Sequence, residues 1–295
     1  MPDASHDTLR TREHLLRSAD CGVCALVEVG SEAADAEVLM IPGMFTARSF
    51  WLSPRGVGLA AHLATAGLRC WILERRGIGA ARQQQAGVRP GMNQAARHDL
   101  PAAFGHIRSR SGRPVFLVAH SFGGILAARA LADPLAAGDC AGLVSFATQC
   151  ETGKSALHPP GSWLTLAIST ARGHLPARLA GLGPEDEPRA AVQDAVRWTT
   201  SARRGARWLD SLRGLPVPQL ALAGGGDTID PPEGCARFAR RLAASDAHFE
   251  LLARSRGWAE DYDHAGMVVS RNARTEVWPY VTAWLRRRIP ARPKA

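Results

Sequence analysis

The chain has 295 residues, of which 46% are hydrophobic and 21% are charged, so it has enough apolar material for one large buried core. Its formal net charge is +9, and arginine supplies nearly all of the positive charge because lysine occurs only at Lys154 and Lys294. The arginines are spread along the chain rather than gathered with aromatic residues, which argues against a nucleic-acid-binding surface.

No segment approaches the roughly 20 consecutive apolar residues that span a bilayer, and the polar stretch 1–17 lacks the apolar centre of a signal peptide. We therefore expect a cytoplasmic protein without a stable membrane anchor. The densest basic cluster comprises residues 286–288 with Arg292 and Lys294, and we expect it to be a solvated helix end.

Cys21 and Cys24 have the spacing of a zinc or redox site. No second pair of ligands follows to complete a four-ligand site, so the sequence favours a hairpin turn here and predicts no metal.

The first half of the chain alternates between strands and helices. The residues around 20–22 predict a turn that joins two short strands between Glu13 and Glu28, and a buried strand over 37–41 then runs into Pro42-Gly43-Met44-Phe45. A helix over 59–66 and a strand over 68–74 follow. The Gly77-x-Gly79 that comes next carries Arg82 where a dinucleotide fingerprint needs a small residue, so we expect no nucleotide cofactor.

The same alternation continues to the end of the chain, apart from one interruption. Helices are predicted over 92–110, 123–132, 233–243 and 274–287, and strands over 115–120, 141–148, 219–223 and 248–252. Regular alternation of this kind is typical of a parallel sheet covered on both faces by helices.

The interruption spans 149–215, where we find helix-like segments but no strand-like run. We expect a helical cap inserted between two parts of one core, 1–148 and 216–295, and lying over the carboxyl edge of the sheet. A packed subdomain that contacts no site is the alternative, because the tryptophans of this segment, Trp163, Trp198 and Trp208, also suit a core.

The strand over 115–120 stops directly before Ser121, and a helix of small residues begins at once. This matches the nucleophile elbow G-x-S-x-G, with Ala119 in place of the first glycine and Gly123 as the second. The elbow needs small residues at both positions because its backbone is strained, and alanine meets that need. The alternative is an ordinary strand, turn and helix in which the serine is a cap.

Three signals occur in the order serine at an elbow, acid after a later strand, and histidine after the last strand. Asp227 lies in Gly-Gly-Gly-Asp-Thr-Ile-Asp-Pro, and His264 lies in Tyr-Asp-His-Ala-Gly-Met before the final helix. With these motifs the chain resembles the α/β-hydrolase family over nearly its whole length. The resemblance implies Ser121 as nucleophile, His264 as general base and Asp227 as the acid that orients the imidazole.

The resemblance also implies an oxyanion hole, formed by the backbone N–H groups of Phe122 and Met44, with Phe45 as the alternative to Met44. Rivals for the orienting acid stay open, because Asp230 follows Asp227 by three residues and His264 is flanked by Asp261 and Asp263. His120 is expected to pack or to form a local hydrogen bond rather than to act as the base.

Within the family, the chain looks most like lipases and esterases, although it has Pro42 where a histidine is common and Glu74 where an aspartate is common. We expect a serine hydrolase that cleaves a carboxylic ester through an acyl-Ser121 intermediate without a cofactor. The expected acyl pocket comprises Phe45, Trp51, Trp163 and Met267, with a small-molecule ester as the substrate.

Two alternative functions remain. An acyltransferase, a thioesterase or a hydrolase of C–C bonds would use the same three side chains, and a non-catalytic ligand-binding protein would use only the fold. The substrate and the oligomeric state stay open.

Overall fold

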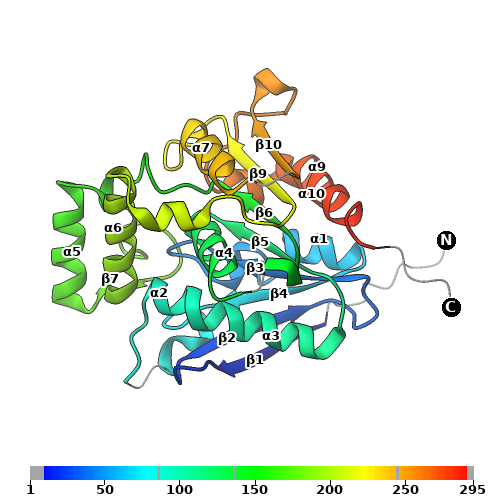
Figure 1. Cartoon of the computed structure of the whole chain (residues 1–295), viewed down its shortest axis with the longest axis horizontal. Coiled ribbons are helices and arrows are strands. Elements are labelled where there is room, and N and C mark those ends of the chain that lie inside the picture. Colours follow the sequence, from blue (N-terminus) through cyan, green and yellow to red (C-terminus); the bar gives the residue numbers. More distant parts are fainter. Residues whose placement is uncertain (1–9, 85–86, 136, 244–245, 291–295) are drawn as a thin grey trace.

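The structure is a computed structural model that describes residues 10–84, 87–135, 137–243 and 246–290. Arg292 and Lys294 of the basic cluster, and the first nine residues of the polar segment 1–17, lie outside the described residues. The structure centres on an eight-stranded sheet in the order β1-β2-β4-β3-β5-β6-β9-β10 (Figure 1). Its strands are β1 (Thr11–Arg17), β2 (Val23–Val29), β3 (Ala36–Ile41), β4 (Leu68–Glu74), β5 (Val115–His120), β6 (Cys140–Phe146), β9 (Gln219–Gly224) and β10 (Ala247–Leu252).

The sheet has an antiparallel edge and a parallel remainder. β1 pairs with β2 and β2 pairs with β4 in antiparallel register, whereas the other strands run parallel. The predicted N-terminal hairpin is therefore confirmed. Cys21 lies in its turn with φ 65°, and Cys24 is buried in β2. The predicted α/β class, with an antiparallel N-terminal edge, is also confirmed.

Alternate residues of the strands face two separate apolar clusters, as the twofold period of a strand requires. In β3, Leu39 and Ile41 join one cluster while Val38 and Met40 join the other. The first cluster is covered by α3 (Leu100–Ser111), α4 (Phe122–Ala132) and α7 (Pro232–Leu242), and the second by α1 (Leu59–Thr65), α8 (Gly266–Val269), α9 (Arg271–Thr275) and α10 (Val277–Arg286) (Figure 1). The core is thus a sheet between two helical layers.

Two predicted helices differ in detail from the structure. The helix over 92–110 is present, but it consists of α2 (Met92–Gln94), a π-helical stretch over Ala95–Asp99 and α3. The predicted C-terminal helix over 274–287 is present as α10, but it starts three residues later, because Glu276 separates it from α9. The Glu276 carboxylate accepts hydrogen bonds from the backbone N–H of Ala259 and from the Tyr262 hydroxyl. The interruption thus ties the final helices to the loop that precedes His264.

Residues 149–215 contain α5 (Gly161–Arg172) and α6 (Arg189–Arg203), which stand at one side of the sheet, together with short 3-10 helices over Ser155–Leu157 and Arg207–Leu212 (Figure 1). The expectation that no strand occurs here is wrong. β7 (His174–Leu175) and β8 (Glu187–Pro188) form a small antiparallel pair. Two residues per strand are too few to show an alternating pattern in the sequence.

A buried ion pair connects three segments on the side of the sheet covered by α3. Arg76, just after β4, is fully buried, and its backbone N–H and side chain donate to Asp99 of the π-helical stretch. The same guanidinium also donates to Asp20 in the hairpin turn. Burial raises the pKa of Asp99 while its hydrogen bonds to Arg76 oppose that rise. Asp99 and Arg76 therefore stay charged in this buried site because each compensates the charge of the other.

Asp99→Asn is expected to lower the free energy of unfolding by about 3–5 kcal/mol, because it removes the fully buried counter-charge of the Arg76 guanidinium and leaves only the partly exposed Asp20. Urea unfolding followed by circular dichroism measures this loss. Asp139→Asn is the matched control, because Asp139 pairs with Arg108 and both side chains are at least two-fifths exposed. That control is expected to lose about 0–1 kcal/mol. Equal losses in the two variants would contradict the analysis.

Candidate active site

Ser121 lies at the turn between β5 and α4, at the carboxyl edge of the sheet. Its backbone has φ 54° and ψ −123°, a conformation that residues with a side chain rarely adopt. Its N–H donates to the carbonyl of Phe146 at 2.8 Å, and its carbonyl accepts the N–H of Gly124 at 3.0 Å. These bonds hold the strained turn in place and leave the hydroxyl at the start of a helix.

The elbow tolerates no larger side chains where it meets neighbouring segments. A Cβ atom on Gly123 would lie 2.3 Å from the carbonyl oxygen of Ile41, and one on Gly124 would lie 2.1 Å from Oγ1 of Thr148. Ala119 is fully buried in β5, where it pairs with β3 and β6. The first glycine of the motif is therefore dispensable here, whereas the second is not.

His264 and Asp227 meet at the same edge, close to Ser121. Nδ1 of His264 lies 2.8 Å from Oδ2 of Asp227, which follows β9. The other oxygen of Asp227 accepts the backbone N–H groups of Ile229 and Asp230, each at 2.8 Å. The carboxylate is almost completely buried and the imidazole is about one-sixth exposed. The ring is thus held at Nδ1, with its other nitrogen free to face a substrate.

None of the three rival carboxylates forms a hydrogen bond with the His264 imidazole among the described residues. Oδ2 of Asp230 is 3.9 Å from Nδ1 of His264, beyond hydrogen-bond distance. Asp261 accepts the N–H of Arg254, and Asp263 accepts the N–H groups of the two residues that follow His264. Asp261 and Asp263 therefore shape the loop around His264, and Asp227 is the carboxylate that bonds to its imidazole.

The hydroxyl of Ser121 donates to Oδ2 of Asp230 at 3.2 Å. No hydrogen bond between Ser121 and His264 occurs in the described part of the chain. Asp230 is itself fully buried and receives the ammonium of Lys154 and the side-chain amide of Gln149. Sequence reasoning singled out neither of these partners, although Lys154 is one of only two lysines.

The predicted oxyanion donors differ in whether their backbone N–H groups already have a hydrogen-bond acceptor. The N–H of Phe45 donates to Oε2 of Glu187 at 3.1 Å, and Glu187 also forms a buried ion pair with Arg75. Phe45 is therefore unavailable as the alternative donor. The N–H groups of Met44 and Phe122 have no hydrogen-bond acceptor among the described residues. The backbone N–H of Glu185 also donates to the carbonyl of Phe45 at 3.0 Å. The segment before α6 therefore bonds to both the N–H and the carbonyl of Phe45.

His120 supports the histidine loop. Its Nε2 lies 2.8 Å from the carbonyl oxygen of His264, so Nε2 carries the proton and donates. Burial lowers the pKa of His120 well below its ordinary value, and the nearby His264 lowers it further. His120 is therefore neutral. The prediction that it packs and hydrogen-bonds agrees with this geometry, although its partner is 144 residues away rather than local.

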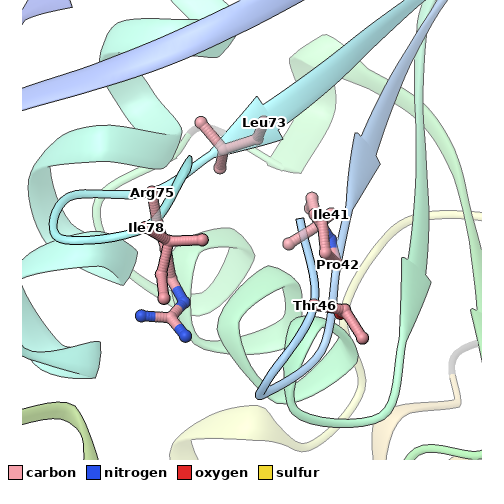
Figure 2. A pocket seen from close by; sticks show the side chains of 6 residues that line it. All are labelled: Ile41, Pro42, Thr46, Leu73, Arg75 and Ile78. Atoms are coloured by element: carbon pink, nitrogen blue, oxygen red, sulfur yellow. The ribbon is translucent and has the colours of Figure 1, made fainter. Parts of the chain in front are cut away.

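A small pocket lies behind the Pro42–Thr46 loop rather than at Ser121. It is lined by Ile41, Pro42, Thr46, Leu73, Arg75 and Ile78, which come from the ends of β3 and β4 and the segments that follow them (Figure 2). Only about 10 Å³ of it can hold the centre of a water molecule. That is room for about one water, too little for an acyl chain.

The four residues of the expected acyl pocket differ in how deeply they are buried. Phe45 is half-buried in the loop beside the elbow. Trp51 and Met267 are fully buried in the apolar cluster beneath α1 and α10. Trp163 is 66% exposed, because α5 turns Ser162 and its other small hydroxyl residues inward. The acyl pocket formed by these residues stays a prediction.

Within the described ranges, no group of His, Cys, Asp and Glu side chains is arranged to hold a metal ion. All six cysteines are free, and burial raises the pKa of the Cys140 and Cys150 thiols to about 12. These two thiols stay protonated at neutral pH. Over the same ranges, no helix has the length and apolar character to cross a membrane.

The chain is similar to known proteins in both sequence and fold. A family model described as serine aminopeptidase, S33, matches residues 34–256. The chain also resembles solved structures along nearly its whole length. An esterase of Thermogutta terrifontis is 18% identical with a TM-score of 0.63, and the match covers 95% of this chain and 100% of that one.

Two further solved structures match the chain with similar TM-scores. An esterase of Pyrococcus furiosus is 14% identical, with 96% and 94% of the two chains covered and a TM-score of 0.61. A soluble variant of the monoglyceride lipase from Saccharomyces cerevisiae, solved with a substrate analogue, is 15% identical, with 98% and 99% covered and a TM-score of 0.66. None of the curated proteins matches the chain. At these identities the structural likeness shows the shared fold.

Gly123→Ala is expected to destabilise the protein by about 1–3 kcal/mol or more, because the added methyl group overpacks the contact with the backbone of Ile41. Gly105→Ala is the matched control, since Gly105 lies inside α3 with no atom within 4 Å of the added Cβ. The control is expected to gain about 0.5–1 kcal/mol from helix propensity. Thermal unfolding of both variants measures the difference. A neutral Gly123→Ala would show that the elbow is not tightly packed.

Proposed function

Because the chain belongs to the serine aminopeptidase S33 family and thus to the α/β hydrolases, we propose that it is a serine hydrolase that cleaves a carboxylic ester. The observation that carries the proposal is the 2.8 Å bond between Asp227 and His264 at the edge where the elbow presents Ser121. Ester cleavage is supported by the similar solved structures, two of which are described as esterases and one as a monoglyceride lipase.

In this proposal Ser121 is the nucleophile. Its Oγ attacks the ester carbonyl while Nε2 of His264 takes the hydroxyl proton, and Asp227 holds the imidazole in the tautomer protonated at Nδ1. The hydroxyl proton must first turn from Oδ2 of Asp230 towards Nε2 of His264. The imidazolium then protonates the departing alcohol, and an acyl-Ser121 ester remains.

The second half of the cycle restores the enzyme. Water attacks the acyl ester while His264 again accepts a proton, and the acid product leaves when Ser121 regains its hydrogen. In both halves the N–H groups of Met44 and Phe122 would stabilise the oxyanion, because they have no acceptor among the described residues. One such donor contributes about 3–4 kcal/mol in other hydrolases.

Residues 149–215 act as the cap in this proposal. Glu185 and Glu187 bond to both sides of the Phe45 backbone, so the cap supports the loop that carries the Met44 donor. The core would consist of 1–148 and 216–295. The proposed acyl pocket comprises Phe45, Trp51, Trp163 and Met267, and a small-molecule ester remains as the proposed substrate.

The same contacts favour an ester over a peptide with a free amino terminus. An aminopeptidase needs a carboxylate that faces the substrate's ammonium group. Asp230 is the carboxylate bonded to Ser121, and Lys154 already neutralises it.

Ser121→Ala is expected to abolish labelling by a fluorophosphonate probe, read by intact mass, and to reduce hydrolysis of p-nitrophenyl esters by at least about 10³-fold. Ser145→Ala is the matched control, since Ser145 is a buried serine of the neighbouring strand β6. The control should label like the wild type. A folded wild type that neither labels nor hydrolyses any ester from acetate to decanoate would favour a ligand-binding protein.

Asp227→Asn is expected to lower kcat by about 10²–10⁴-fold with little change in KM, because the amide no longer holds His264 in the useful tautomer. Asp261→Asn serves as the control, since Asp261 bonds only to a backbone N–H of its own loop in the structure. Steady-state kinetics with a p-nitrophenyl ester compare the two. Equal losses would argue against Asp227 as the orienting acid.

A further inference from the structure

A buried ion pair touches the proposed nucleophile. Asp230 is fully buried, the side chain of Lys154 is only 4% exposed, and the two are paired. Lys154 comes from the segment after β6, and Asp230 comes from the segment after β9, three residues beyond Asp227. The mechanism described above uses neither residue.

The two oxygens of Asp230 face different partners. Oδ1 receives the ammonium of Lys154 and the amide of Gln149. Oδ2 receives the hydroxyl of Ser121 at 3.2 Å and lies 3.9 Å from Nδ1 of His264. A carboxylate therefore stands beside both the serine and the imidazole, with a cation on its far side.

The segment that carries Lys154 is fixed against the acid loop. Oε1 of Gln149 accepts the N–H groups of Glu151 and Thr152 at 2.7 and 2.8 Å. The N–H of Lys154 donates to the carbonyl of Ile229 at 3.2 Å, and a Cβ on Gly153 would lie 2.1 Å from that same oxygen. The pair is thus built into two loops that meet closely.

Electrostatics gives the pair a function. A lone carboxylate 3.9 Å from an imidazole would stabilise the protonated ring, which cannot act as a base. The same carboxylate would also hold the serine hydroxyl strongly, because hydrogen bonds to an ionised acceptor are about twice as strong as neutral ones. A cation on its other oxygen reduces both effects.

We propose that Asp230 is a positioning residue for the Ser121 hydroxyl, and that Lys154 cancels its charge so that His264 keeps its base function at neutral pH. This inference rests on the proposed function of Ser121 and His264. It adds to that function a charge-balanced hydrogen-bond acceptor that orients the hydroxyl before the substrate binds.

Other groups around His264 stay constant in the test. Asp227 bonds to Nδ1, and Asp263 belongs to the same loop as His264. His120 packs against the ring with centroids 4.6 Å apart, and burial keeps it neutral by lowering its pKa. Changes at Lys154 and Asp230 therefore alter the charge at His264 directly.

The experiment compares Lys154→Met, Asp230→Asn and the double variant. Lys154→Met leaves a negative charge beside His264, so the acid limb of the kcat/KM profile is expected to move to higher pH by about one unit. Asp230→Asn leaves the positive charge of Lys154, so the limb is expected to move to lower pH by a similar amount. The double variant should return it to within about 0.3 units of the wild type, because it removes both charges.

Two readouts separate this inference from the proposed function. The pH profile is measured by hydrolysis of p-nitrophenyl acetate. An NMR titration of the His264 ring reports the effect of the Lys154 and Asp230 charges on that ring without any substrate. If the wild type hydrolyses no ester, the proposed function fails, while opposite shifts of the ring titration in the two single variants still support the charge balance. Circular dichroism and thermal unfolding identify the variants that fold.

Arg288→Met is the control, because it removes one positive charge where Arg288 pairs with Asp246 near the end of the chain. It should leave the profile unchanged. The inference is overturned if folded Lys154→Met and Asp230→Asn both leave the acid limb in place, or if they move it in the same direction. A structural role alone would not produce shifts of opposite sign that cancel in the double variant.

Discussion

The site depends on one steric constraint, the close approach of the first turn of α4 to the end of β3. Gly123 allows the carbonyl of Ile41 to lie where a side chain would otherwise be, and the strained backbone of Ser121 follows from that contact. The loop with Met44 begins one residue after Ile41. The proposed nucleophile and the proposed oxyanion donor are therefore positioned by the same contact, and neither can shift without the other.

Three carboxylates then join the remaining loops to one another. Asp227 holds the imidazole and the turn after β9, and Glu187 holds the backbone of Phe45. Glu276 joins the final helices to the loop before His264. Each acceptor satisfies N–H or hydroxyl groups that would be costly to bury alone. The edge of the sheet is thus held together by polar bonds between loops.

The sequence predicted the sheet and the order of the three site residues, because burial leaves a periodic pattern and the elbow needs small residues at fixed spacing. The pairing of Lys154 with Asp230 could not be predicted in this way. It joins residues 76 positions apart, and neither belongs to a periodic segment. The break at Glu276 was missed for a similar reason, since the pattern of α9 and α10 continues through it while the carboxylate serves another loop. The outward position of Trp163 could not be predicted, because α5 packs through small hydroxyl residues and turns Trp163 and Leu164 outward.

The bonds of Glu187 have a consequence for how a ligand gains entry. This residue is fully buried, and it joins Arg75 of the core to the backbone of Phe45. A swing of the whole segment 149–215 away from the sheet would break these charge-assisted bonds, which are stronger than hydrogen bonds between neutral groups. Any opening of the segment is therefore opposed at its β8 end, where these bonds tie it to the core.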